Sequence, residues 1–238
     1  MLTGAGISTE SGIPDFRSPG GLWTRYDPRK LTFDKFCASA DTRRLYWEMG
    51  NELYPALRDA QPNAAHRALV ALERRGCLRR IVTQNVDGLH QKAGSSPNVM
   101  IEIHGTALEV GCLTCGARQD RGPVQARFAA GEQDLRCGCG GLLKPATISF
   151  GQAMPERETA MAFADAEAAD LFLVIGSSLE VYPAAGLPRA AVEHGTPLLI
   201  VNRDATPYDD YAELTLHGSA GETLGAIVSA LGLSLTDA

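Results

Sequence analysis

Short apolar runs that end in polar clusters recur along this chain. They cover residues 80–83, 170–175 and 197–201. Apolar residues recur with helical spacing over residues 63–74, 156–169, 187–194 and 221–231. A repeated order of strand, polar cluster and helix is typical of an open α/β sheet of parallel strands. Because ligands of such sheets bind beyond the carboxyl ends of the strands, we expect the polar clusters to converge on one ligand.

Two stretches break this alternation. Residues 25–62 have a helical pattern with a stripe of aromatic residues, which we interpret as packing rather than as a cofactor site. Residues 108–146 are rich in glycine, carry two cysteine pairs and lack long apolar runs. We therefore predict a helical module over residues 25–62, a metal-binding module over residues 108–146, and a sheet domain made of residues 1–24, 63–107 and 147–238.

Composition limits the classes of function. The 238 residues are 45% hydrophobic and 21% charged, which is ordinary for a globular protein. The net charge of −6 argues against direct binding of nucleic acid through a general basic field. The apolar runs are too short to cross a bilayer, and no secretory leader precedes the first motif. We therefore expect a cytoplasmic protein that does not bind membranes.

Four of the cysteines form two tight pairs, Cys112 with Cys115 and Cys137 with Cys139. Two such pairs on glycine-bearing turns are how a structural tetrahedral zinc is held, with no position left open for substrate. Metal binding would then supply the folding energy of a module with so small a core. Free or disulfide-paired thiols are the alternative, and the Cys-x-Cys spacing of the second pair is shorter than the commoner Cys-x-x-Cys.

The chain opens on a glycine turn within a string of small and hydroxyl-bearing residues. The string contains Gly4, Ala5 and Gly6 and ends in the triplet Asp15, Phe16 and Arg17. Glycines let the backbone approach a phosphate closely. Thr9 stands where the dinucleotide fingerprint Gly-x-Gly-x-x-Gly needs its third glycine. Because such a turn should follow a strand, we expect that a first strand and a short helix are missing before Met1.

Two further polar clusters follow apolar runs. Asn85 and Asp87 lie two residues apart, so they point the same way if the strand continues. Such a pair can bind ribose hydroxyls and a carboxamide, although it also makes ordinary turns beside a glycine. His104 follows an apolar run and precedes Gly105, which suits a general base near neutral pH. A buried structural histidine is the alternative.

Together these motifs resemble the sirtuins, the NAD-dependent protein deacylases. The resemblance lies in the opening string, in the paired cysteines, and in residues 84–90, 102–105, 144–151, 176–184 and 201–202. The motifs occur in the family's order and cover essentially the whole chain. The resemblance implies a Rossmann-like open parallel sheet with an inserted zinc-binding module and a helical module. It also implies NAD as co-substrate and Zn²⁺ as a structural ion.

The resemblance implies roles for individual residues. His104 would be the general base, Gln84 and Asn85 would hold the nicotinamide ribose, and Asp87 the carboxamide. The NAD site would be lined by Gly4, Ala5, Gly6, Asp15, Phe16 and Arg17, with Phe16 shielding the nicotinamide. The adenosine half of NAD would contact Gly176, Ser177, Ser178, Asn202 and the backbone near Ala220. The acyl-lysine tunnel would be flanked by Phe150, Gly151 and Val181, with the peptide added as a strand between two loops.

The resemblance implies an enzyme that removes acetyl or other acyl groups from protein lysines and gives nicotinamide and O-acyl-ADP-ribose. Protein mono-ADP-ribosylation is an alternative with the same NAD cleavage. A non-catalytic zinc-ribbon adaptor is another, but it leaves Asn85, Asp87 and His104 unexplained.

Acyl choice depends on the helical module. Sirtuins that prefer succinyl or malonyl groups resemble one another in a Tyr-x-x-Arg pair that binds the acyl carboxylate. The matching helix here, residues 47–54, has no arginine, and its Glu48 and Glu52 would repel an acidic acyl group. We therefore expect acetyl or longer apolar acyl chains, with acidic acyl groups as the alternative.

Overall fold

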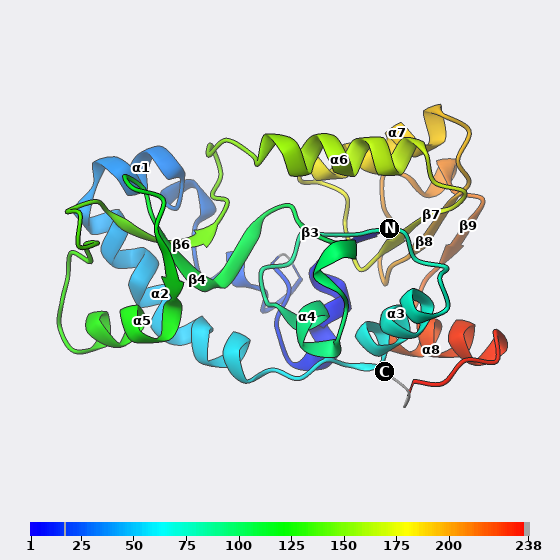
Figure 1. The fold of residues 1–238 in the computed structure, drawn as a ribbon, viewed down its shortest axis with the longest axis horizontal. Helices are drawn as coiled ribbons and strands as arrows, with labels where there is room; N and C mark the ends of the chain where they lie inside the picture. Colours follow the sequence, from blue (N-terminus) through cyan, green and yellow to red (C-terminus); the bar gives the residue numbers. More distant parts are fainter. Residues whose placement is uncertain (17, 236–238) are drawn as a thin grey trace.

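A six-stranded parallel sheet forms the centre of the computed structural model, which describes residues 1–16 and 18–235 (Figure 1). Arg17 therefore lies outside the described residues. The strand order is β3-β2-β1-β7-β8-β9. The strands are β1 Leu2–Thr3, β2 Ile81–Thr83, β3 Met100–Glu102, β7 Phe172–Ile175, β8 Leu198–Val201 and β9 Leu214–Leu216. This order, in which the chain turns from one half of the sheet to the other between β1 and β7, confirms the predicted Rossmann-like sheet.

A strand does precede the glycine turn, because Leu2 and Thr3 form β1; the expectation that a further segment with a short helix precedes Met1 stays a prediction. β1 has only two residues, yet it lies at the centre of the sheet, with β2 on one side and β7 on the other. Leu2 and Thr3 are fully buried. Because both neighbours supply hydrogen bonds, two residues suffice to place the glycine turn at the carboxyl edge of the sheet.

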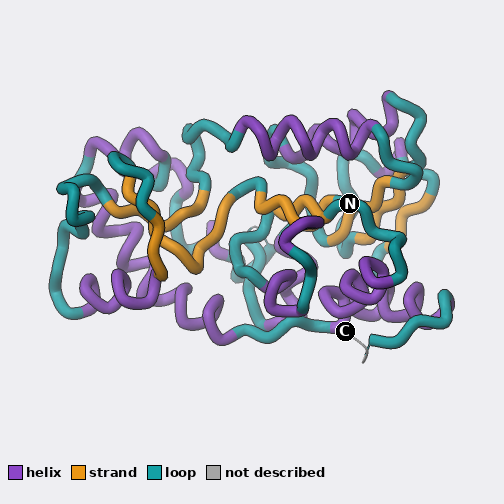
Figure 2. The backbone as a smooth tube through the Cα atoms, in the orientation of Figure 1, coloured by secondary structure: helices purple, strands orange, loops and turns teal. Residues whose placement is uncertain are grey.

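Helices cover both faces of the sheet (Figure 2). α6 (Glu156–Glu167) and α7 (Leu187–Glu193) pack on one face, and α3 (Ala64–Arg74) and α8 (Ala220–Ala230) pack on the other. Successive residues of one strand serve the two cores, since Val174 packs with α6 and α7 while Ile175 packs with α3 and α8. The short helix α4 (Leu89–Ala93) follows β2.

The rest of the chain forms a second body beside the sheet, on the left of Figure 1. It contains the helices α1 (Phe33–Ala38), α2 (Ala40–Asp59) and α5 (Arg121–Ala129), and an antiparallel sheet of β5 (Arg118–Asp120), β4 (Gly105–Cys112) and β6 (Leu143–Thr147). Trp47 of α2 is buried against Val110 and Phe128, so the two modules share a core. The aromatic stripe is thus packing, as interpreted from the sequence.

Short 3-10 helices join these elements. They are η1 Ala5–Ser11, η2 Leu22–Thr24, η3 Pro28–Lys30, η4 Pro97–Val99, η5 Ala184–Gly186 and η6 Asp209–Tyr211. Within the described part of the chain, every helix is too short or too polar to pass through a lipid bilayer.

Candidate active site

A cavity of about 640 Å³ lies at the carboxyl ends of β1, β2, β7 and β8 and continues to α2. All the residues that the sequence analysis assigned to NAD, to the base or to the acyl-lysine, Arg17 excepted, line it. They are Gly4, Ala5, Gly6, Asp15, Phe16, Gln84, Asn85, Asp87, His104, Phe150, Gly151, Gly176, Ser177, Ser178, Val181, Asn202 and Ala220. The fold thus brings the predicted clusters together around one space, as the sheet topology leads us to expect.

The glycine turn is pinned to the loop after β7. The N–H of Gly4 donates to the carbonyl of Ile175 at 3.0 Å, and the N–H of Gly6 donates to the carbonyl of Gly176 at 2.8 Å. A Cβ on Gly4 would lie 2.7 Å from the Gly176 oxygen, closer than side chains approach. These glycines are therefore needed for the contact between two loops, and not only for access to a phosphate.

Asn85 and Asp87 meet at one residue that the sequence analysis missed, Ser8. The Ser8 hydroxyl donates to Asp87 Oδ2 at 2.7 Å and accepts from Asn85 Nδ2 at 3.1 Å. Both side chains therefore point the same way, as their spacing predicts. Burial raises the pKa of Asp87, while Ser8 and the N–H of Leu89 donate to its carboxylate.

A buried polar layer supports this cluster from below. The Thr83 hydroxyl accepts from the N–H of Asn85 at 3.1 Å and from the Thr3 hydroxyl at 2.9 Å. The Thr3 oxygen also lies 3.0 Å from Nε2 of His90. The rings of His90 and His66 are in contact, with 5.0 Å between their centroids. Burial lowers the pKa of His66 to about 4 and that of His90 to about 3, so both are neutral at pH 7.

His104 lies in the turn between β3 and β4. Its Nδ1 is 3.1 Å from the carbonyl oxygen of Gln84, and a carbonyl can only accept, so Nδ1 carries the proton. Nε2 is then the basic nitrogen, and it has no hydrogen-bond partner among the described residues. Burial lowers the pKa of His104 below its ordinary value. The turn needs Gly105, whose φ is +72° and whose Cβ would collide with the carbonyl of Ala146.

Gln84 and Asn202 form hydrogen bonds in the remaining loops of the sheet edge. Gln84 Nε2 donates to the Ser177 hydroxyl at 2.8 Å, which joins the ends of β2 and β7. Asn202 follows β8, and its side-chain amide donates to the carbonyl of Asp204 at 2.7 Å. Ala220 is the first residue of α8, and the N–H of the next residue, Gly221, donates to Glu10 at 2.9 Å.

Aromatic contacts connect the glycine-turn segment to the loop that carries Phe150. The rings of Phe16 and Trp23 have centroids 5.2 Å apart, and those of Trp23 and Phe150 are 6.2 Å apart. Phe150 is 45% exposed at the cavity mouth. A ligand that orders Phe16 is therefore coupled by packing to the place where a peptide would bind.

The cavity has two chemically different ends. We call Ser8, Asn85, Asp87 and His104 the sheet end. We call the wall that contains Met49, Leu53 and Leu57 of α2 and Arg121 of α5 the helical end. Glu48 and Glu52 do not line the cavity; they are exposed and pair with Arg44 and Arg25. The structure therefore gives no reason to expect that Glu48 and Glu52 repel an acidic acyl group.

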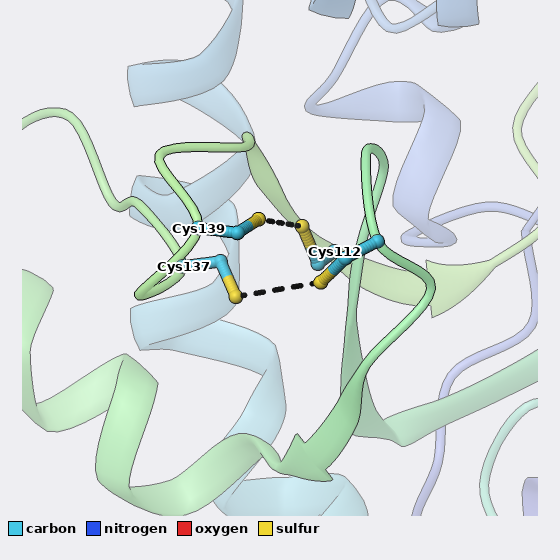
Figure 3. Close-up of side chains that lie close together, drawn as sticks. Cys112, Cys137 and Cys139 are labelled. Atoms are coloured by element: carbon cyan, nitrogen blue, oxygen red, sulfur yellow. Dashed lines mark hydrogen bonds between the residues drawn. The ribbon is translucent and has the colours of Figure 1, made fainter.

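The four cysteines of the two pairs form one cluster (Figure 3). Their sulfur atoms all lie within 4.8 Å of one another. The Cys112–Cys139 and Cys115–Cys137 sulfur separations are 3.5 and 3.8 Å. These separations are far beyond a disulfide bond and near the ~3.8 Å edge of a tetrahedron with Zn–S distances of ~2.3 Å. The donor set fits a structural zinc, and the Cys-x-Cys spacing does not prevent it.

Comparisons with known proteins agree with this site. The model of the Sir2 family matches residues 4–183. The NAD-dependent protein deacetylase 2 of Streptomyces coelicolor is 47% identical over 236 residues, which are 98% of this chain and 97% of that protein. The NAD-dependent protein deacetylase of Thermodesulfovibrio yellowstonii is 45% identical over 97% of this chain and 89% of its own length.

Solved structures give the same result. A Sir2 mutant with a deacetylated p53 peptide and 3'-O-acetyl ADP ribose superposes with a TM-score of 0.90 at 36% identity, covering 98% of this chain and 93% of that chain. A Sir2 complex with a p53 peptide and NAD⁺ has a TM-score of 0.87 at 36% identity, covering 97% of this chain and 92% of that chain.

Proposed function

This chain belongs to the Sir2 family, and from that premise we propose how its residues carry out the NAD-dependent removal of acetyl groups from protein lysines. The reaction consumes NAD, an acetyl-lysine and one water, and gives free lysine, nicotinamide and O-acetyl-ADP-ribose. The observation that carries the proposal is the sheet end. There a base with one free ring nitrogen, a buried amide and a buried carboxylate line one cavity.

The hydrogen-bonding groups that line the cavity suit NAD. Amides and hydroxyls of Gln84, Asn85 and Ser177 lie along the sheet edge, where ribose hydroxyls and a carboxamide find both donors and acceptors. When bound, NAD supplies a carbon whose bond to nicotinamide breaks, so that the acetyl oxygen replaces a good leaving group. Asp87 would hold the carboxamide, and Asn202 and the start of α8 would hold the adenosine half.

His104 acts as the general base in this proposal. Its Nδ1–H stays on the Gln84 carbonyl, which fixes the tautomer and leaves Nε2 to take a proton from a ribose hydroxyl. Its lowered pKa keeps Nε2 unprotonated at neutral pH. Asn85 is held by Ser8 and by the N–H bond to Thr83, so it orients the ribose beside that base.

The zinc ion has a structural role. Cys112, Cys115, Cys137 and Cys139 would hold it, and four thiolates leave no position for substrate. The ion supplies folding energy to the segment that carries α5 and the β4–β6 sheet. We propose that residues 108–146 act as this zinc module, residues 25–62 as the helical module, and residues 1–24, 63–107 and 147–238 as the NAD-binding domain.

The acyl-lysine enters beside Phe150, Gly151 and Val181, which line the cavity mouth. Acylated proteins are the partners of this site, and we propose that they meet the enzyme in the cytoplasm. The acidic net charge supports our proposal that nucleic acid is not bound directly.

NAD labelled in its adenosine half tests the proposal against protein mono-ADP-ribosylation. Incubation with an acetyl-lysine peptide should leave all label in small molecules and release O-acetyl-ADP-ribose. Label fixed to protein, with the peptide still acetylated, would contradict deacetylation and favour ADP-ribosyl transfer.

A further inference from the structure

The buried cation Arg121 has no counter-ion in the described part of the chain. Arg121 is 5% exposed, lines the helical end, and forms no ion pair with any of residues 1–16 and 18–235. A buried guanidinium without an anion is costly, because burial removes water without replacing it by opposite charge. The acidic residues of the cavity lining are Glu10, Asp15, Asp87 and Asp204. All of them belong to the loops at the sheet edge.

The guanidinium is held firmly in place. Nη1 donates to the carbonyl of Ala107 at 3.1 Å, and Nε donates to Oε1 of Gln125 at 3.2 Å. Gln125 in turn donates to the carbonyl of Trp47 at 3.0 Å and to Asn51 at 2.7 Å. The guanidinium carbon also lies 5.1 Å from the ring centre of Tyr54. These contacts orient the fork before any ligand arrives.

The remaining nitrogen lies against Gly50, a residue of the cavity lining. Nη2 has no hydrogen-bond partner among the described residues, and it lies against Gly50, where a Cβ would overlap it and Gln125. Gly50 itself lines the cavity together with Leu53. The missing side chain of Gly50 therefore makes the room in which the guanidinium sits.

Arg121 lines the same cavity as His104. Ala107, whose carbonyl accepts from Nη1 of Arg121, lines it as well. A four- or five-carbon acyl chain with a terminal carboxylate spans roughly 5 to 6 Å, so it extends beyond the place of an acetyl group.

We propose that Arg121 binds the terminal carboxylate of an acidic acyl group, such as succinyl- or glutaryl-lysine, at the helical end of the cavity. The protein then removes these groups in addition to acetyl, and prefers them to apolar chains of the same length. This inference rests on the proposed function and leaves its reaction unchanged. The arginine comes from α5 of the zinc module, and not from α2, the helix in which the resemblance led us to look for it.

Steady-state kinetics of the zinc-loaded, full-length chain test the proposal. One peptide carries acetyl-, butyryl-, succinyl- or glutaryl-lysine; butyryl has the four carbons of succinyl without its carboxylate. We expect kcat/KM for succinyl or glutaryl to exceed that for butyryl by about tenfold or more. Turnover of acetyl without this preference overturns the inference alone. Absence of turnover with every peptide overturns the proposed function, and the inference with it.

Variants locate the effect. Arg121→Met should lower the succinyl-to-acetyl ratio of kcat/KM about 10- to 100-fold, and Arg121→Lys should retain part of that ratio. Arg118→Met is the matched control, because Arg118 is exposed and pairs with Glu109. Its ratio should equal that of the wild type. A ratio unchanged in Arg121→Met overturns the proposal. If Arg121→Met does not fold, the proposal is still tested by the kcat/KM ratio of Arg121→Lys and by the wild-type comparison of succinyl with butyryl.

Discussion

The two ends of the cavity are built from opposite chemistry. At the sheet end, buried polar groups satisfy one another, as Ser8 does with Asn85 and Asp87. At the helical end, the wall is largely apolar, and Arg121 has no anion beside it among the residues that the structure describes. Ser8, Asn85 and Asp87 are thus held in place before a substrate binds, and Nε2 of His104 is left for the substrate; at the helical end, we propose that the substrate supplies the anion.

The two ends of the cavity would therefore have different roles, one in the reaction and the other in the choice of acyl group. The sheet end stands at the carboxyl edge of the parallel sheet and, in the proposed function, determines which bonds change. The helical end is formed by α2 and α5, outside that sheet, and in our proposal it contacts the part of the substrate that varies. Changes at the sheet end should therefore affect every acyl group alike, and changes at the helical end should affect the ratio between acyl groups.

The largest effect is expected from His104→Ala. Loss of a general base should lower kcat/KM about 10²- to 10⁴-fold for acetyl and longer acyl groups alike. The thermal shift caused by NAD should remain, because Asn85 and Asp87 are unchanged. His194→Ala is the control, since His194 is exposed at the end of α7. A loss that differs strongly among acyl groups would contradict the separation of the two ends.

Removal of zinc should lower activity by disturbing the helical end of the cavity. The cluster cysteine Cys112 shares a core with Trp47 of α2, so loss of the ion should disorder α5 and its contacts. We expect tryptophan fluorescence to change and activity to fall more than about tenfold, because structural zinc supplies roughly 10 kcal/mol of folding energy. Cys77→Ser, outside the cluster, should behave as wild type. Metal-free protein with unchanged fluorescence and activity would refute the structural role.

A smaller effect is expected from Gly50→Ala. The added methyl group overlaps Arg121 Nη2 and Gln125 Oε1, so the guanidinium must move. The succinyl-to-acetyl ratio should fall several-fold, with a stability cost of about 1–3 kcal/mol from overpacking. Gly225→Ala is the matched control, because its nearest neighbour would be 3.8 Å away. Equal ratios in both variants would argue that Arg121 does not face the acyl group.

The smallest effect concerns pH and the support of the sheet end. His66 and His90 have pKa values of about 4 and 3 in the folded state, below the ~6.5 of an unfolded chain. The unfolded chain binds more protons below pH 6.5, so stability is full above that pH and declines as the pH falls toward 4. Each histidine should contribute a slope of up to about 1.4 kcal/mol per pH unit.

Urea unfolding at pH 7 and pH 5 measures this slope. His90→Gln should reduce it, whereas His194→Gln should leave it as in the wild type, because His194 is exposed. Identical slopes in all three proteins would show that the buried histidines do not support the sheet end as described.

The sequence predicted the longer elements because their patterns are long enough to be distinctive. The strands β2, β7 and β8 coincide with apolar runs, and α3 begins at Ala64, directly after Asn63, whose side chain caps it. β1 was not recognised because two residues carry no period, and β9 is short, with Leu214 exposed. Tertiary pairing alone defines these two strands.

The sheet end was predictable because each of its segments is a contiguous motif that follows a strand. Ser8 was missed, although it lies in the opening string, since nothing in its spacing distinguishes it from Thr9 or Ser11. The helical end was not predictable in the same way. Arg121, Ala107 and Gly50 come from three separate segments that only the fold brings together.

The expectation that Glu48 and Glu52 would repel an acidic acyl group did not take into account which face of α2 lines the cavity. Met49, Leu53 and Leu57 repeat every four residues and define the face of α2 that lines the cavity. The glutamates share the neighbouring face, where they pair with Arg44 and Arg25. Helical spacing alone separates the two sets.

The most direct test of the account is the stoichiometry of one reaction, followed by mass spectrometry with and without NAD. An acetyl-lysine peptide, the zinc-loaded protein and NAD should give deacetylated peptide, nicotinamide and O-acetyl-ADP-ribose in equal amounts, and nothing without NAD. Nicotinamide released while the peptide keeps its acetyl group would contradict the account, because the sheet end would then cleave NAD without transferring the acetyl group.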